Sequence, residues 1–329
     1  MPITLSYAHA VKTIIDDVVL DKIKDTTNPP FFKPNNNATN IEQLKKGAQQ
    51  KTAKENQTKE SSLFENDQLH QIFTQTTPRN YTITGNKSNP IDLTVQTTTN
   101  LTTAIINIEQ QATQKSTTIH LICNTPTMLV FNIKNQPNTS VEMQLNITSN
   151  HHPLFIHSNI IVANNSTIHS QTILTTHSEL FFQRTIAHIH ESASFTEQTY
   201  ATASKTSYVD TKTTSILENQ NSQANVTFKG VVYDAAKIIT QSNTIVTKNA
   251  NNSKAKEKSE ILIIDPSGKA EAIPQLEVYN DNTQCSHSGS ITQINPEKLF
   301  FLESRGISKL NAQQMIIDGF LNKNIETLE

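Results

Sequence analysis

Short runs of alternating apolar and polar residues return about every 8–15 residues between positions 81 and 264, yet no glycine occurs between Gly85 and Gly230. Alternating runs at regular spacing indicate an all-β sandwich, barrel or solenoid. Sandwiches and barrels depend on tight hairpins, whose turns favour Asn-Gly or Asp-Gly. A solenoid has wider corners, where asparagine tolerates the left-handed backbone, and stacked Asn and Thr can hydrogen-bond along its axis. The pattern therefore favours a β-helix.

The composition fits this interpretation. Thr, Asn, Ser and Gln together supply 128 of the 329 residues, and apolar residues only 35%. An average globular chain has about 45–50% apolar residues when glycine is included. Each coil of a solenoid buries only an inward row and contacts only its neighbours, so a thin core is sufficient. The expected strands are Ile91–Val95, Ala104–Ile108, Thr118–Cys123, Met128–Ile133, Val141–Ile147, Thr167–Leu174, Ser178–Phe182, Val226–Val232 and Ile261–Ile264.

The chain divides into three regions. Residues 1–78 form an N-terminal helical region, in which the Asn-, Gln- and Lys-rich segment 34–62 reads as flexible. Residues 79–290 form the β-helix core, and residues 291–329 form a C-terminal helical region. We expect amphipathic helices near residues 11–23 and 63–73 from their three- and four-residue apolar spacing.

Two helices are expected at the C-terminal end. Pro296 opens the first and Gly306 closes it. Ser308 caps the second, and we expect the pair to dock beside the solenoid and to block its open end. One apolar face of the second helix comprises Ala312, Met315, Ile316, Phe320 and Leu321.

Several classes of protein are excluded by simple counts. No apolar run approaches the length of a membrane span, and the N-terminus lacks a secretory signature, which predicts a cytoplasmic protein. Two cysteines, Cys123 and Cys285, are too few for a disulfide framework. Arginine occurs three times and no lysine cluster alternates with aromatic residues, so no nucleic-acid partner is expected.

A polysaccharide lyase or hydrolase is the main enzymatic alternative for a β-helix. Such enzymes need paired carboxylates, about 5–10 Å apart in glycosidases. Residues 101–200 carry only eight charged side chains, and no aspartate occurs between Asp92 and Asp210. Phosphate-binding, dinucleotide-binding and nucleophile-elbow motifs are also missing. We therefore predict that the chain is not an enzyme.

Two pairs of residues could bind a metal. His188 and His190 share one face of a strand, with Glu191 adjacent, but two ligands do not make a site, and histidine also serves as a structural ladder residue. Cys285 and His287 likewise share one face if their segment is extended. A thiolate and an imidazole suit iron, zinc or an iron–sulfur cluster, although a buried structural cysteine is the common alternative.

The sequence around Cys285 and His287 resembles that of a known protein family. The motifs are Ala272-Ile273-Pro274-Gln275-Leu276-Glu277-Val278, Cys285-Ser286-His287, Leu299 to Ser308 and Ala312 to Phe320, with Phe228 to Tyr233 and Ala236 to Asn243 upstream. Together they resemble the C-terminal signature of the SufB/SufD family of iron–sulfur cluster assembly proteins. The Cys-Ser-His form and Phe301-Leu302 are similar to the SufD branch of that family.

This resemblance implies a right-handed parallel β-helix between helical ends and a non-catalytic scaffold subunit of the SufBCD complex. It implies pairing with SufB through the β-helices and a nascent cluster at their interface, with His287 as a candidate ligand and Cys285 as a second. The isolated chain would bind no cofactor stably, and the complex could hold a flavin. The resemblance places the docking of the ATPase SufC on the C-terminal helices, at Leu299, Phe300, Phe301, Arg305, Gly306, Met315, Ile316 and Phe320.

A self-associating structural solenoid remains an alternative. Uncharged strands resist pairing at sheet edges poorly, so the chain alone could form a homodimer by joining edge to edge.

Overall fold

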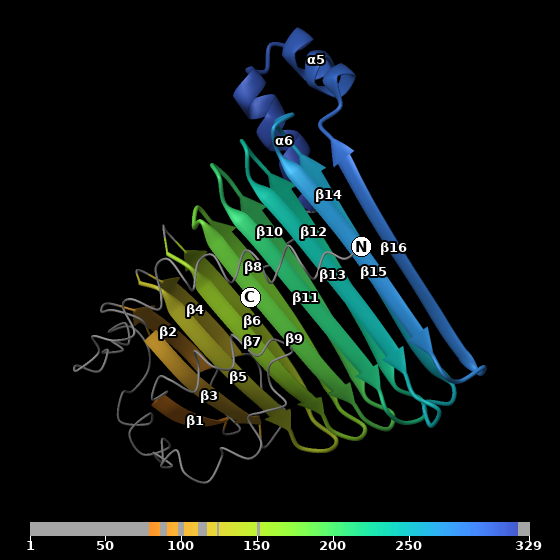
Figure 1. The fold of residues 1–329 in the computed structure, drawn as a ribbon. Helices are drawn as coiled ribbons and strands as arrows, with labels where there is room; N and C mark the ends of the chain where they lie inside the picture. Colours follow the sequence, from red (N-terminus) through yellow and green to blue (C-terminus); the bar gives the residue numbers. More distant parts are fainter. Residues whose placement is uncertain are drawn as a thin grey trace, which may run out of the picture.

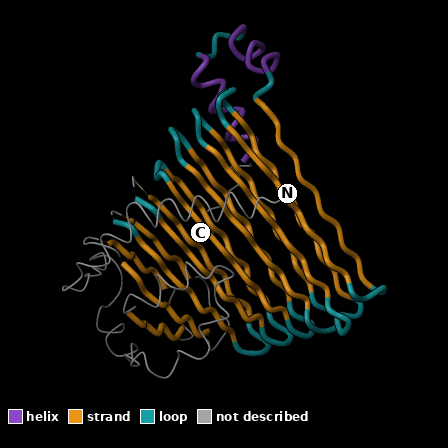
Figure 2. Tube along the Cα trace, viewed as in Figure 1, coloured by secondary structure: helices purple, strands orange, loops and turns teal. Residues whose placement is uncertain are grey.

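The computed structural model describes residues 79–85, 91–97, 102–110, 117–123, 125–149 and 152–321. They form sixteen strands followed by two helices (Figures 1 and 2). The predicted helices near residues 11–23 and 63–73 and the flexible segment 34–62 lie outside the described residues.

All sixteen strands belong to two parallel sheets of eight strands each. Sheet A comprises β1 (Arg79–Gly85), β3 (Thr102–Gln110), β5 (Thr127–Asn135), β7 (Leu154–Val162), β9 (Leu180–Ile189), β11 (Tyr208–Leu217), β13 (Lys237–Val246) and β15 (Lys269–Val278). Sheet B comprises β2 (Ile91–Thr97), β4 (Thr117–Cys123), β6 (Ser140–Ser149), β8 (Thr167–Thr176), β10 (Ser194–Ala203), β12 (Gln223–Val232), β14 (Ser253–Ile263) and β16 (Thr283–Gln293). Consecutive strands alternate between the sheets, so each coil contributes one strand to each. The predicted parallel β-helix is confirmed.

The core is a continuous apolar cluster between the two sheets. Alternation places every second side chain inward, as in β10, where buried and half-buried residues alternate along the strand. Parallel register then stacks inward residues of successive coils, for example Ile168, Phe195 and Ala224. Each coil therefore covers the inward row of the coil before it.

Asparagine shapes the corners, as the glycine-poor sequence predicts. Asn138, Asn165, Asn221 and Asn252 adopt positive φ values of 59°, 56°, 58° and 56°. Each lies in a corner between sheet A and sheet B, and its backbone N–H donates to a carbonyl of the next corner. Asparagine reaches this left-handed region at lower cost than most residues, so these corners need no glycine.

A ladder of asparagine side chains runs along sheet A. Asn132 Nδ2 donates to Asn107 Oδ1 at 2.9 Å, and Asn159 Nδ2 donates to Asn132 Oδ1 at 3.0 Å. The residues lie on β3, β5 and β7 in direct register. The expected stacking of asparagine along the solenoid axis is confirmed here.

Two helices follow the solenoid: α5 (Pro296–Ser304) and α6 (Lys309–Leu321). Both were predicted from the sequence. Neither of them has the length and apolar character that a membrane-crossing helix requires.

Candidate functional site

The last coil of the solenoid differs from the others because its inner face is open. Its strands, β15 and β16, are the end strands of sheets A and B. No side chain of either strand is buried, whereas every preceding strand from β4 onward has several. Figure 1 shows α5 and α6 grouped at the C-terminal ends of the last strands of sheet B, and within the described part of the chain neither helix buries a side chain of β15 or β16. The expectation that the helix pair blocks the open end was therefore wrong.

Cys285 and His287 lie on this open inner face. Both belong to β16, and their two-residue spacing directs them to the same side, as predicted. Cys285 stands in register with Ala255 and packs against the core while remaining half-buried. His287 stands in register with Glu257 and is exposed. A thiol and an imidazole are thus presented together at the end of the solenoid.

Glu257 lies directly behind His287 on β14. Its side chain is 2% exposed and accepts hydrogen bonds from Ser242 Oγ at 3.0 Å and Thr244 Oγ1 at 2.6 Å. Burial raises the pKa of Glu257, and the two hydroxyl groups and attraction to His287 partly oppose the rise. Residue spacing alone gave no signal of this neighbour.

The same inward row holds a second buried acid. Glu197 and Glu257 flank Val226 in the register of sheet B, on β10, β12 and β14. Glu197 accepts hydrogen bonds from Thr213 Oγ1 at 3.0 Å and Thr185 Oγ1 at 3.4 Å. Burial raises the pKa of Glu197 to about 7, although both threonines act to lower it. The inward row of sheet B therefore contains two buried carboxyl groups among its apolar side chains.

Cys123 is a structural thiol. Its side chain is 1% exposed within the core cluster. Burial raises the pKa of this thiol to about 12, against a smaller lowering by Thr127. Because the thiolate is the form that ligates metal, Cys123 is unsuited to that role.

Glu218, and not the adjacent Glu191, is the partner of the paired histidines. His188 Nδ1 lies 2.7 Å from Glu218 Oε1, and His190 Nδ1 lies 3.3 Å from Glu218 Oε2. Glu218 follows β11 and comes from the next coil, whereas Glu191 accepts from Gln220 Nε2 at 2.7 Å. Within the described part of the chain, no group of three or more His, Cys, Asp or Glu side chains is arranged to hold a metal ion. Glu218 thus connects the two histidines to the next coil.

The boundaries of α5 are set by strong capping interactions. Asn295 accepts at its side chain from the N–H groups of Glu297 and Lys298, which fixes the start. At the end, Gly306 has φ of 85° and donates to the Glu303 carbonyl at 2.9 Å, while Ile307 donates to the Leu302 carbonyl at 3.2 Å. This pair of bonds is the Schellman motif, which favours glycine at the left-handed position. Gly306 therefore has a structural role.

Helix α5 presents an apolar surface to solvent. None of its residues is buried, and Phe300 and Phe301 are 71% and 55% exposed. The Arg305 guanidinium lies 4.8 Å from the centre of the Phe301 ring. On α6, Leu310 and Met315 are 75% and 53% exposed. These exposed aromatic and apolar side chains make α5 and α6 a candidate interaction surface.

Helix α6 is anchored to the outside of sheet B. Ile317 packs with Val231 of β12 and Leu262 of β14, and Phe320 lies against this cluster. Lys229 Nζ donates to the Phe320 carbonyl oxygen at 2.8 Å. The predicted apolar face of α6 was thus partly wrong: the residues that are buried are Ala312 and Ile317, while Met315 is exposed.

Most residues predicted to dock SufC lie on the free surface of the helices. Phe300, Phe301, Arg305 and Met315 are exposed, together with the backbone at Gly306. Leu299, Ile316 and Phe320 are half-buried, and Phe320 belongs to the anchor of α6.

Comparison with known proteins adds independent evidence. A family model described as "SUF system FeS cluster assembly, SufBD core domain" matches residues 127–320, which is more than half of the chain. The iron-sulfur cluster assembly protein SufD of Escherichia coli is 28% identical over 180 residues, which is 54% of this chain and 42% of that protein.

Shorter matches agree with these. An iron-sulfur cluster assembly SufBD family protein of Staphylococcus saprophyticus is 30% identical over 101 residues, 31% of this chain and 22% of the relative. Another from Synechocystis is 25% identical over 119 residues, 36% of this chain and 26% of the relative. The chain therefore aligns with less than half the length of each of these relatives.

Proposed function

Because the chain belongs to the SufB/SufD family of SUF-system iron–sulfur cluster assembly proteins, we propose that it is a non-catalytic scaffold subunit that pairs with SufB and docks the ATPase SufC. The open last coil carries this proposal. It combines an uncovered inner face, the free edges of two sheets and two side chains that suit iron.

The edges of β15 and β16 are the proposed pairing site for SufB. An end strand presents unpaired backbone N–H and C=O groups, which another strand can extend. Val278 and Ile291 on these strands are each 44% exposed. A partner that continues both sheets would satisfy the backbone groups and cover these side chains. The same partner would close the open coil.

His287 and Cys285 are the proposed contribution of this chain to a nascent cluster, which is the cargo of the complex. Two ligands are too few for a cluster, so the remaining ligands would come from SufB. An imidazole ligates iron as the neutral base, so protonation of His287 would weaken binding. A flavin in the complete complex is compatible with this arrangement.

SufC is proposed to bind α5 and the exposed side of α6. The two proposed contact regions are separate, because α5 lies beyond the strand ends and contributes no buried side chain to the solenoid (Figure 1). Substitutions on α5 can therefore remove one partner without disturbing the other.

Co-expression with SufB and SufC, followed by purification through a tag on this chain, tests the proposal. We expect a three-protein complex from the unmodified chain. Combined Phe300→Ala and Phe301→Ala should lose SufC and retain SufB. Retention of SufC by this double variant would refute the assignment of α5, and failure of the unmodified chain to retain SufB would refute the scaffold role.

Cluster loading is measured separately, from iron content and visible absorption of the anaerobically purified complex. We expect His287→Ala to lower loading without loss of SufB. His169→Ala is the matched control, because His169 is an exposed histidine on β8 in the same sheet. Equal loading of both variants would make His287 a structural residue.

A self-associating solenoid is the second candidate, and the same free edges support it. Light scattering of the chain alone separates a monomer from a homodimer. Displacement of the second copy by SufB would show that the two partners compete for one edge.

A further inference from the structure

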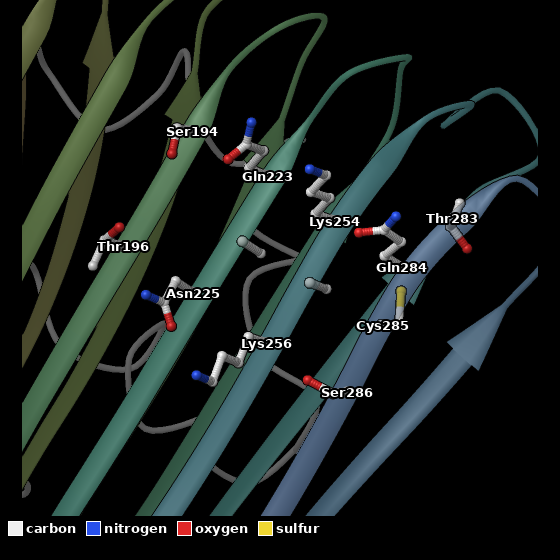
Figure 3. Close-up of a pocket in the computed structure, with 12 residues that line it drawn as sticks. Ser194, Thr196, Gln223, Asn225, Lys254, Lys256, Thr283, Gln284, Cys285 and Ser286 are labelled. Atoms are coloured by element: carbon white, nitrogen blue, oxygen red, sulfur yellow. The ribbon is translucent and has the colours of Figure 1, made fainter.

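The outer face of sheet B is hollowed over the N-terminal halves of β10, β12, β14 and β16. The groove has a volume of about 590 Å³. Figure 3 shows the side chains that project into it from neighbouring strands. Its floor is polar and free of aromatic residues; the lining includes Gln223, Asn225, Lys254, Lys256, Gln284 and Ser286.

Lys254 and Lys256 give the groove its charge. Both are exposed on the outward face of β14, and no aspartate or glutamate lines the groove. Among the described residues no carboxylate pairs with either lysine. By contrast, the next lysine on this face, Lys258, lies 3.0 Å from Glu260. Lys258, outside the groove, is therefore paired with a carboxylate, whereas, among the described residues, Lys254 and Lys256 inside it are not.

The spacing of these lysines matches an extended chain. Residues two apart on a strand point to the same side and lie about 6–7 Å apart. An extended peptide has the same repeat, so acidic residues at alternate positions can face Lys254 and Lys256 together. The amide groups of Gln223, Asn225 and Gln284 flank the lysines and can bond to peptide carbonyl groups.

We propose that this groove binds an extended acidic peptide segment of a partner protein, with alternate carboxylates paired to Lys254 and Lys256. Charge complementarity and the repeat of the strand support this occupant. A single-stranded nucleic acid is disfavoured because its bases need aromatic stacking platforms, which the lining lacks.

The groove is continuous with the end of the solenoid, because its last wall is β16. A bound segment would therefore lie beside the edge that we propose for SufB pairing. The peptide-binding proposal does not depend on that pairing, since all lining residues belong to this chain.

The test uses the full chain and a fluorescein-labelled peptide of alternating Glu and Thr, with binding followed by fluorescence anisotropy. A peptide of alternating Gln and Thr has the same shape without charge. We expect the acidic peptide to bind at least about tenfold more tightly, and its affinity to fall several-fold between about 50 and about 300 mM salt. Equal binding of the two peptides would overturn the proposal.

Variants locate the binding. We expect the double change Lys254→Gln and Lys256→Gln to weaken the acidic peptide by about tenfold or more. Lys298→Glu is the control, because Lys298 is an exposed lysine on α5 that lies outside the groove. Far-UV circular dichroism confirms that each variant is folded. Binding unchanged by the double variant would show that the peptide adds to a sheet edge instead. Tighter, lysine-dependent binding of a labelled oligothymidine than of the peptide would reject the proposed ligand class.

Discussion

Replacing Glu197 by glutamine keeps the size of a buried side chain and removes its charge. Burial raises the pKa of Glu197 from 4.5 to about 7 in the folded chain. The carboxyl group is enclosed by the solenoid, with Thr185 and Thr213 as hydrogen-bond donors. Glutamine accepts from one threonine through its oxygen and can donate through its NH2 group to the other hydroxyl, so both contacts can be kept. This exchange of donor and acceptor does not depend on pH, so the pH dependence of the difference reports ionisation.

The sign of the pH effect follows from the raised pKa. Below pH 4.5 the carboxyl group is protonated in both the folded and the unfolded chain, so it imposes no penalty. Between pH 4.5 and about 7 the unfolded chain has lost this proton while the folded chain still holds it, so the free energy of unfolding falls over this range and levels off above it. A shift of about 2.5 pKa units corresponds to about 3 kcal/mol at most.

Urea unfolding at about pH 5 and about pH 8 measures this effect. Far-UV circular dichroism is the suitable signal, because the chain contains no tryptophan. We expect the stability of Glu197→Gln relative to the unmodified chain to increase by about 2–3 kcal/mol between these pH values. The contributions of the other titrating groups to stability are the same in both proteins, so they cancel in this difference.

Glu303→Gln is the matched control, because Glu303 is an exposed carboxylate on α5. It should show no such change with pH. A Glu197→Gln difference that is the same at both pH values would refute the argument, since it would mean that Glu197 is ionised equally in the folded and unfolded chains.

Two further outcomes are expected. Burial raises the pKa of Cys123 to about 12, whereas Cys285 is half-buried in the open coil, so an aromatic disulfide reagent at about pH 8 should modify one thiol per native chain. Cys285→Ser should reduce this to none, and modification of Cys123 in the native chain would contradict its burial. Lys229→Met removes the donor to the Phe320 carbonyl at 2.8 Å and should speed amide exchange in α6 by about tenfold, a loss of about 1–2 kcal/mol of local stability. Lys298→Met serves as its control, and unchanged exchange would show that apolar packing alone anchors α6.

The corners and the last helices were predictable because their signals are local. The scarcity of glycine and the abundance of asparagine correctly predicted left-handed corners such as those at Asn165 and Asn221. Pro296 and Gly306 correctly marked α5, because capping depends on residues within one turn.

Some strands gave no recognisable signal. β10 and β11 were missed because threonine occupies both their inward and outward positions, which hides the alternation of apolar and polar residues. Thr199 and Thr211, for example, are 6% and 4% exposed. An isolated strand rich in threonine looks the same whether its hydroxyl groups face solvent or the interior.

Contacts between coils could not be predicted from the sequence because they depend on the register of the whole stack. Thr167 pairs with Ser194, a step of 27 residues, whereas Gln223 pairs with Lys254, a step of 31. Such variable steps conceal which residues become neighbours. The contact between Glu218 and His188, and the place of Glu257 behind His287, appear only when the coils are stacked.

The open last coil connects the stability of the solenoid with its proposed role. In every inner coil, the next coil covers the inward row and pairs the backbone. Among the described residues no further coil follows β15 and β16, so Cys285 is half-buried and His287 exposed while the rows behind them are closed. An internal coil would have buried the same two residues and excluded a cluster. Under the proposed function, a ligand pair at the end of a solenoid would be completed by the molecule that covers that end, so pairing and cluster binding would be parts of one event.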